Sequence, residues 1–162
     1  MYGFLELREW ITALYRTRNP DGAIYEPRLA IEPFSYNLTI ASIAAVAGTA
    51  TGIIAINANA DFYCTRINYS ATTGTAQNVG TKTVAQLRVL LVDAGSSRPF
   101  FNSAQPLESF ASNEYPNRFL PYPRTLRANT SVSAQFTGFG TAAETYQLDL
   151  TLDGVNVYQF GN

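Results

Sequence analysis

The chain has 162 residues, enough for one domain with a sizeable core and a short additional segment. Its 11 basic and 12 acidic side chains give a net charge of −1, so nothing in the composition attracts it to nucleic acid or to an anionic membrane. It has no histidine, and so lacks the usual general base and the commonest metal ligand; the single cysteine excludes an internal disulfide. These counts favour a non-enzymatic protein without a metal or cofactor.

Arginine supplies all but one of the basic residues, and aromatic residues make up 13% of the chain. Arginine and aromatic side chains are enriched in protein interfaces, whereas lysine is depleted there. Only 14% of the residues are charged, which favours a surface that contacts other proteins or sugars. A nucleotide bias in the source genome would explain the arginine count equally well.

Residues 1–33 differ from the rest of the chain. Apolar side chains at helical spacing predict a short amphipathic helix that also carries the single tryptophan. A turn at 19–22 and the Glu-Pro pairs that follow predict an extended arm after the helix. So short a helix is not stable alone in water, so its apolar face must pack on its own sandwich or on a neighbouring subunit. The residues expected at that contact are Phe4, Leu7, Trp10, Ile11 and Leu14.

Two segments bear on membrane association, and neither predicts it. Charged residues at positions 6, 8 and 9 interrupt the N-terminus too early for a signal peptide. No residue between Glu32 and Asp61 is charged, but polar side chains recur throughout this run. Two strands joined by a turn at Gly48–Gly52 explain the run better than a spanning helix.

From residue 34 onward the apolar residues recur with a period of two. Phe34, Tyr36 and Leu38 alternate with polar residues, as in a strand with one buried face. Strands joined by turns, without a second helical pattern, predict an all-β antiparallel sandwich over residues 34–162. The expected strands span 34–40, 51–58, 62–69, 84–93, 130–137, 146–153 and 155–160.

Two connections within the predicted sandwich have distinctive sequences. Asp153-Gly154 is a strong signal for a tight hairpin, with a strand pattern on both sides of it. Residues 94–129 are rich in proline and aromatic residues. We expect this long segment to be an ordered loop that its aromatic side chains fix in place.

Candidate catalytic groups are few. Cys64 has no histidine to activate it and lies within an expected strand, which indicates a buried, inert thiol. Glycoside hydrolysis needs two carboxylates, and Glu108 and Glu114 are a better pair for it than Asp149 and Asp153, but no further feature supports them. Asp149 and Asp153 alternate with leucine and fit a solvated strand face. We therefore predict no catalytic residue.

Asn57, Asn59 and Asp61 place side-chain oxygens at every second position, which is a pattern found in calcium-binding loops. The segment lacks the glycine and the terminal glutamate of an EF-hand loop. Asparagines at the end of a strand explain the pattern better, so we predict no metal site.

The segment 94–129 also contains a candidate contact surface. Tyr115, Phe119 and Tyr122 lie among polar residues that include Arg124, a pattern that suits either protein or carbohydrate contacts. The alternative interpretation is that these rings pack the loop against the sandwich.

A series of short segments carries a resemblance to known proteins. In chain order they are Thr51–Ile56, Asp61-Phe62, Arg66-Ile67, Val84–Val92, Ser97–Phe100, Pro116, Arg118–Pro121, Arg127–Ser131 and Leu152–Val155. Their order and spacing over residues 34–160 resemble small jelly-roll virion proteins of tailed bacteriophages, of the capsid-decoration, minor-capsid and neck or collar kinds.

The resemblance implies a jelly-roll sandwich that self-associates and docks on the major capsid protein, the portal or the connector. It also implies a virion location, with assembly in the cytoplasm of the bacterial host. A carbohydrate- or receptor-binding sandwich is the alternative. That alternative predicts exposed ring faces among Tyr115, Phe119 and Tyr122.

Overall fold

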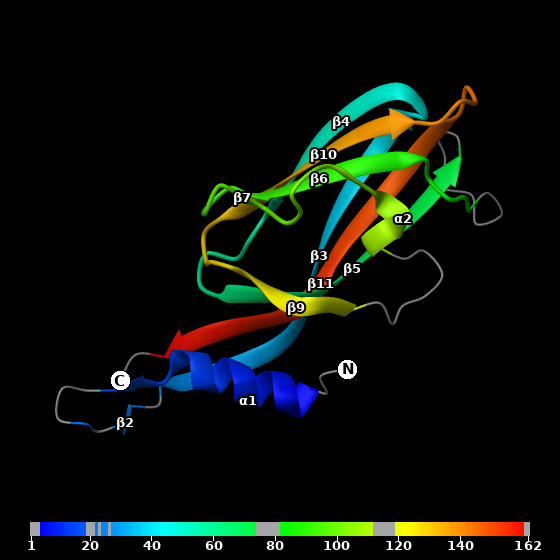
Figure 1. Cartoon of the computed structure of the whole chain (residues 1–162). Coiled ribbons are helices and arrows are strands. Elements are labelled where there is room, and N and C mark those ends of the chain that lie inside the picture. Colours follow the sequence, from blue (N-terminus) through cyan, green and yellow to red (C-terminus); the bar gives the residue numbers. More distant parts are fainter. Residues whose placement is uncertain are drawn as a thin grey trace.

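The computed structural model of the chain describes residues 4–18, 22, 24–25, 27–73, 82–111 and 119–160, without the side chains of Phe4, Thr17 and Arg18 (Figure 1). Strands dominate these residues, and a single longer helix precedes them. The elements are α1 (Phe4–Tyr15), β1 (Thr17–Arg18), β2 (Ile24–Tyr25), β3 (Arg28–Ala44), β4 (Val46–Ala55), β5 (Asp61–Thr73), β6 (Leu87–Asp93), β7 (Arg98–Pro99), β8 (Gln105–Pro106), α2 (Leu107–Phe110), β9 (Phe119–Leu126), β10 (Ser131–Phe139) and β11 (Thr145–Phe160).

Two antiparallel sheets face each other and form the predicted sandwich (Figure 1). Within the described residues one sheet has the order β3-β11-β5-β9, and the other has the order β4-β10-β6-β7, with β8 also paired to β6. Apart from the short strands β7 and β8, which stay beside β6, successive strands pass from one sheet to the other, and the first and last strands of the sandwich, β3 and β11, pair with each other. This winding is that of a jelly roll, which confirms the predicted fold class.

The core lies between the two sheets and is built by the predicted alternation. Every second residue of β6, of β10 and of β11 as far as Leu152 is buried, as the period-two pattern requires. The predicted core faces are confirmed in Ala85, Leu87, Val89 and Leu91, in Val132, Ala134 and Phe136, and in Tyr146, Leu148, Leu150 and Leu152.

The predicted hairpin at Asp153-Gly154 is wrong, because β11 continues through both residues to Phe160. At this point the register between β11 and β5 shifts, and a β-carbon on Gly154 would overlap the carbonyl oxygen of Tyr63. The glycine therefore permits a close approach of two backbones at a β-bulge and does not mark a turn.

The predicted turn at Gly48–Gly52 is also wrong, because both glycines lie inside β4 and the chain reverses at Ala45. A β-carbon on Gly48 would overlap the carbonyl oxygen of Ala44, and one on Gly52 would lie 2.6 Å from the side chain of Leu38. The charge-free run thus forms β3 and β4, as two strands. No helix in the described part of the chain has the length and apolar character that crossing a bilayer requires.

The segment 94–129 contains more regular structure than the predicted loop. Its described parts form β7, β8, α2 and the eight-residue strand β9. Prolines at both β7 and β8 fit their positions at the margin of a sheet. Aromatic side chains hold this segment in place, as predicted. The ring centroids of Phe100 and Phe101 lie 6.5 Å apart, and those of Phe101 and Phe110 lie 4.6 Å apart.

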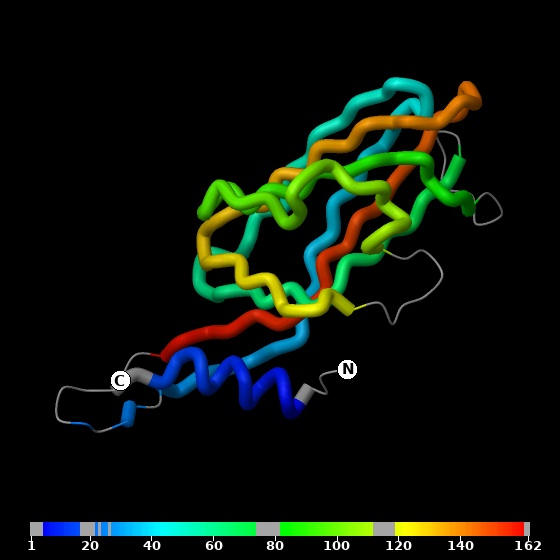
Figure 2. Tube along the Cα trace, viewed as in Figure 1, coloured from blue at the N-terminus to red at the C-terminus, as the bar shows by residue number. Residues whose placement is uncertain are grey.

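The predicted extended arm is the first part of β3. This strand runs from Arg28 to Ala44 and so passes without a break from the 1–33 segment into the 34–162 segment. It pairs with the end of β11 down to Arg28 and Phe160, so the two strands extend beyond the sandwich as a ribbon beside α1 (Figure 2). Of the turn predicted at 19–22, residues 19–21 lie outside the described residues, whereas Gly22 has a φ of +86°.

We predict that Gly154→Ala lowers the free energy of unfolding by at least about 2 kcal/mol, because rigid backbone blocks the added β-carbon. Urea denaturation measures this loss. Gly140→Ala is the control: its β-carbon meets the end of the flexible Gln86 side chain at 2.6 Å, and we expect a loss below ~1 kcal/mol. Equal losses in the two variants would contradict the proposed close approach at Gly154.

Candidate interaction surfaces

Helix α1 packs on its own chain. Leu7 and Ile11 are buried against Val155 and Val157, on the part of β11 that leaves the sandwich, and against Tyr63 of the neighbouring strand β5. Here the outward residues of β3 and β11 change from polar to apolar, which creates a platform for the amphipathic face of the helix.

The residues predicted for a partner contact on this helix therefore divide into two groups. Ile11 is fully buried, and Leu7 keeps only 8% of its surface exposed. Trp10 and Leu14 keep 38% and 53% of their surfaces exposed, and Trp10 also makes an edge-to-face contact with Tyr63, with ring centroids 5.8 Å apart. The side chain of Phe4 lies outside the described residues.

A hydrogen-bond chain holds the C-terminal end of α1. The hydroxyl of Tyr63 donates to Tyr15 at 3.1 Å, and Tyr15 donates to Asp61 Oδ2 at 2.8 Å. Asp61 also accepts from the Arg127 guanidinium and from the Ala128 backbone amide, both at 2.8 Å. Burial, followed by the hydrogen bonds with Tyr63 and Asp61, raises the pKa of Tyr15 above its usual value, so it stays a neutral donor.

The carboxylate of Asp61 does not fit a calcium ligand, because donors from this chain occupy both of its oxygens. The side-chain oxygen of Asn57 likewise accepts the backbone amide of Asn59 at 2.9 Å, in a local turn. Among the described residues no three acidic or cysteine side chains converge in a way that would hold a metal ion.

Cys64 lies in the middle of β5 and is fully buried, as predicted. Burial raises the pKa of its thiol to about 12. The thiol has no access to solvent and is almost entirely protonated near neutral pH.

The two sheets have contrasting outer faces. On the β3–β11–β5 sheet, polar side chains bond to one another across the strands: Ser35 and Arg66 donate to Asp153, Thr151 donates to Asn37, and Thr39 donates to Asp149. Asp153 is therefore the centre of a polar network, with an ion pair to Arg66 at 2.8 Å, and not a purely solvated residue as predicted. Most polar side chains of this face therefore have a partner within the chain, although the side-chain oxygen of Asn68 has none among the described residues. Of the other predicted carboxylate pair, Glu108 is exposed on α2, and Glu114 lies outside the described residues.

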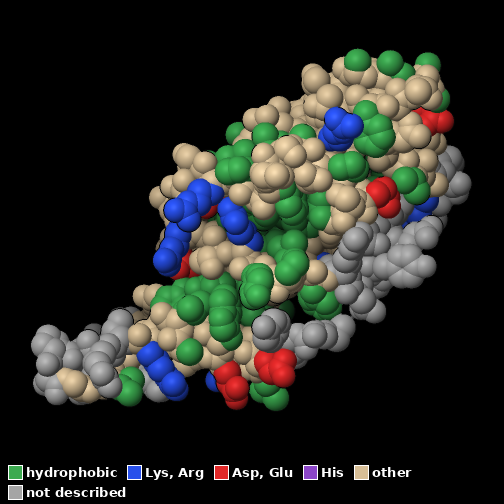
Figure 3. All heavy atoms as spheres, viewed as in Figure 1, with side chains coloured by type: hydrophobic (Ala, Val, Ile, Leu, Met, Phe, Trp, Pro, Cys, Tyr) green, Lys and Arg blue, Asp and Glu red, His purple; other side chains and the backbone are tan. Residues whose placement is uncertain are grey.

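The outer face of the other sheet, which we name the β4–β10–β6 face, has almost no charge. Its outward side chains are small, polar or aliphatic apart from Phe139 and Arg88, and only Arg88 is charged. The Arg88 guanidinium lies 5.4 Å from the ring centroid of Phe139. In the space-filling view, the upper part of the molecule carries few charged side chains (Figure 3). The residues of the face, from the strand registers, are Val46, Thr49, Thr51, Ile53, Ala55, Arg88, Leu90, Val92, Ser131, Ser133, Gln135, Thr137 and Phe139.

Both edge strands on one side of the sandwich, β3 and β4, lie in the charge-free run. Proteins usually protect such edges with lysine, proline or other charges, because an open edge can pair with another chain. Beyond Pro33 these two strands have none of those features up to the end of β4. Ile53 on β4 is 68% exposed, and Val46 at the start of that strand is 49% exposed.

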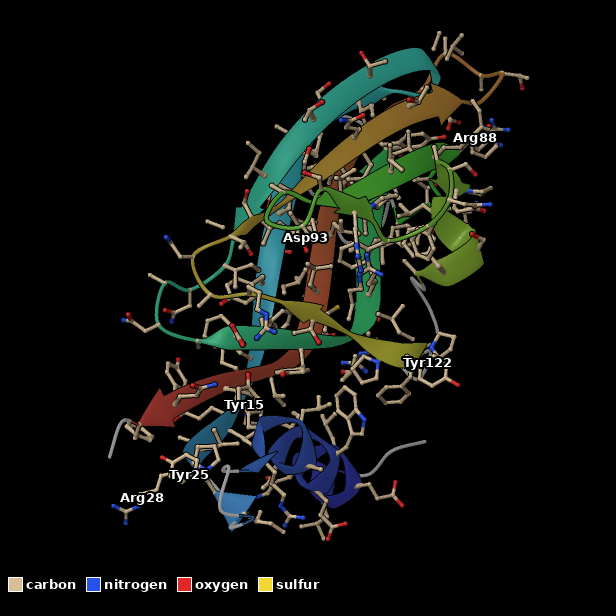
Figure 4. All side chains as sticks on the ribbon, turned by 60° about the vertical axis from the view of Figure 1, so that its left-hand side comes forward. Tyr15, Tyr25, Arg28, Arg88, Asp93 and Tyr122 are labelled. Carbon is tan, nitrogen blue, oxygen red and sulfur yellow. The ribbon has the colours of Figure 1, made fainter. Side chains whose placement is uncertain are left out.

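The predicted residues on β9 take different positions. Tyr122 is 80% exposed, beside a small hollow that Leu7, Trp10 and Pro123 also line (Figure 4). Phe119 is 40% exposed, and Arg66 lies 5.9 Å from the centroid of its ring. Tyr115 lies outside the described residues.

Arg124 faces a large open cleft of about 770 Å³ between α1 and the sandwich. Its guanidinium lies 5.1 Å from the ring centroid of Phe100 and donates to the carbonyl oxygen of Pro99 at 2.9 Å. Arg98 and Arg127 line the same cleft, although the sequence predicted neither of them as a contact residue.

Comparison with known protein families, with curated proteins and with solved structures gave no match. The geometry of this chain alone therefore carries the functional argument.

We predict that Ile11→Ala weakens the docking of α1 by about 3 kcal/mol, because the variant leaves a cavity under the helix. Trp10 is the single tryptophan, so its fluorescence reports on α1, and its transition should move to lower urea concentration. Leu5→Ala, at a side chain that is 72% exposed, is the matched control and should leave the transition unchanged. A Trp10 transition that Ile11→Ala does not shift would contradict this packing.

We also predict that a disulfide reagent leaves Cys64 unmodified in the folded protein at about pH 8, because the thiol is buried and protonated. Absorbance of the released thiol measures the reaction. In concentrated guanidinium chloride the same thiol should react fully. Rapid modification of the folded protein would show that β5 is accessible, contrary to the structure.

Proposed function

We propose that this chain is a non-enzymatic structural virion protein of a tailed bacteriophage, which self-associates and docks on the capsid or the head–tail connector region in a decoration or collar role. The β4–β10–β6 face carries the proposal. It is a broad sheet surface with a single charge, and it ends at a free edge strand with exposed apolar side chains.

The face with the fewest charges to remove from water is the less costly one to bury in a contact. Apolar area removed from water contributes roughly 25 cal/mol per Å², whereas each buried charge without a partner costs free energy. The β4–β10–β6 face has one charge to desolvate, and Arg88 already contacts the ring of Phe139. The opposite sheet would have to break its network around Asp153 to form a contact. Self-association through the β4–β10–β6 face is therefore the less costly choice.

The edge of β4 adds a second mode of contact. Among the described residues no strand pairs with the outward backbone groups of β4, so a strand of another copy can pair there and extend the sheet between subunits. On a repeating particle surface, several such modest contacts act together, so each of them need not be strong. Jelly rolls occur in viral capsid proteins and also in lectins, so the fold is compatible with the proposal but does not single it out.

A carbohydrate- or receptor-binding sandwich is the second candidate, and Tyr122 is the observation that favours it. Its ring is 80% exposed on β9 and lies beside Trp10 and Pro123. Exposed aromatic rings of this kind suit the apolar faces of sugars. A glycan array probed with the full chain tests this candidate.

We predict that the full chain has a solution mass of at least twice 17.7 kDa, and that Ile53→Lys reduces the mass to that of the monomer. The reason is that a lysine on β4, at the edge of this face that associates, would be desolvated without a partner charge. Multi-angle light scattering after size exclusion measures the mass.

Asn59→Lys is the control for charge, because Asn59 is exposed in the turn after β4 and is not one of the residues of this face. It should leave the oligomer intact, and both variants should unfold at the same urea concentration as the unchanged chain. A monomeric unchanged chain, or an Ile53→Lys oligomer of undiminished mass, contradicts the proposal. The virion location is tested separately by mass spectrometry of purified phage particles, in which peptides of this chain should be present.

A further inference from the structure

We infer that the cleft between α1 and the sandwich binds an acidic polypeptide segment of a partner protein. This inference concerns a different surface from the β4–β10–β6 face and does not depend on self-association. Figure 3 shows basic side chains gathered at the edge of the sandwich above the α1 region. Three of the chain's arginines, Arg98, Arg124 and Arg127, line this cleft of about 770 Å³.

Arg98 comes from β7, whereas Arg124 and Arg127 lie at the end of β9 and just after it, and the three arginines differ in their partners. Arg127 is paired with Asp61, although 72% of its side chain remains exposed. Arg124 rests on Phe100 and bonds to a carbonyl oxygen, so it keeps its charge without a carboxylate partner. Arg98 is exposed on β7 and has no ion-pair partner within the described residues. The cleft therefore keeps at least two positive charges that no described carboxylate neutralises.

The acidic residues nearest to these arginines are engaged elsewhere. Asp61 accepts bonds from Tyr15, Arg127 and Ala128. Asp93 pairs in register with Arg98 across β6 and β7, but it is 5% exposed and accepts bonds from the backbone of Gly95 and the hydroxyl of Ser96. Carboxylates of an incoming ligand would thus meet guanidinium groups and not a competing acid.

The residues on the opposite wall of the cleft indicate which kind of ligand carries those carboxylates. Tyr15, Tyr25 and Pro27 line it, from α1, β2 and the residues before β3. Figure 4 shows Tyr15 and Tyr25 on the α1 side, with Asp93 in the sandwich above them. Tyrosine and arginine are the residue types enriched where proteins bind polypeptides tightly. A wide, open cleft with separated arginines suits an extended chain with several carboxylates better than one compact anion.

The inference is tested with a fluorescein-labelled peptide of alternating glutamate and glycine, by fluorescence anisotropy on the full chain. We expect binding that weakens as salt increases, and no binding of the matched glutamine–glycine peptide. Arg98→Gln alone should weaken binding several-fold, and Arg98→Gln with Arg124→Gln should weaken it by at least roughly tenfold. Arg98 is exposed, so the single variant tests the cleft even if loss of the Arg124–Phe100 contact destabilises the double variant.

Arg88→Gln is the matched control, since Arg88 lies at the far end of the sandwich from Tyr15 and Tyr25 (Figure 4). It should leave peptide binding unchanged. Failure of the acidic peptide to bind overturns the inference, and so does equal weakening by Arg88→Gln. Tighter binding of a heparin-derived oligosaccharide or of a single-stranded oligonucleotide, lost in Arg98→Gln, would also overturn it, because the cleft would then serve a different polyanion.

Discussion

The pairing of β3 with β11 is the interaction on which the rest of the structure depends. These strands are the first and last of the sandwich, and their ladder runs from Ala44 and Thr145 down to Arg28 and Phe160. The upper part closes the jelly roll, whereas the lower part leaves the sandwich and forms the platform for α1. One continuous ladder thus positions the core, the helix and the cleft between them. The bulge at Gly154 lies where the ladder changes from one role to the other.

The two outer faces of the sandwich differ in how their side chains are satisfied: one is hydrogen-bonded within the chain, and the other is nearly uncharged. The β3–β11–β5 sheet carries polar side chains that bond to one another around Asp153, so most polar groups of this face have partners in the isolated chain. The β4–β10–β6 face has no such network and carries exposed Ile53 and Phe139. Assembly through the second face leaves the first in water, a division of roles that underlies the proposed structural function.

Much of the fold could be predicted from the sequence, because burial imposes a period of two that is visible in residues such as Leu148, Leu150 and Leu152. The glycines could not be interpreted in the same way. Gly48 and Gly154 exclude a β-carbon, but a sequence does not tell whether a turn or a close backbone approach demands this. The cleft was equally hidden, since Arg98, Arg124 and Tyr15 meet only through tertiary packing. The charge-free run was visible, but its placement on two edge strands was not.

The central claim is that the β4–β10–β6 face is buried when copies of the chain associate. Hydrogen–deuterium exchange at low and at high protein concentration tests it most directly, because the free backbone edge of β4 exchanges readily unless another chain covers it. The account predicts that β4 gains protection as concentration rises, while exchange in β3, β5 and α1 changes little. Protection that is independent of concentration, or that appears instead on the polar sheet around Asp153, would contradict it.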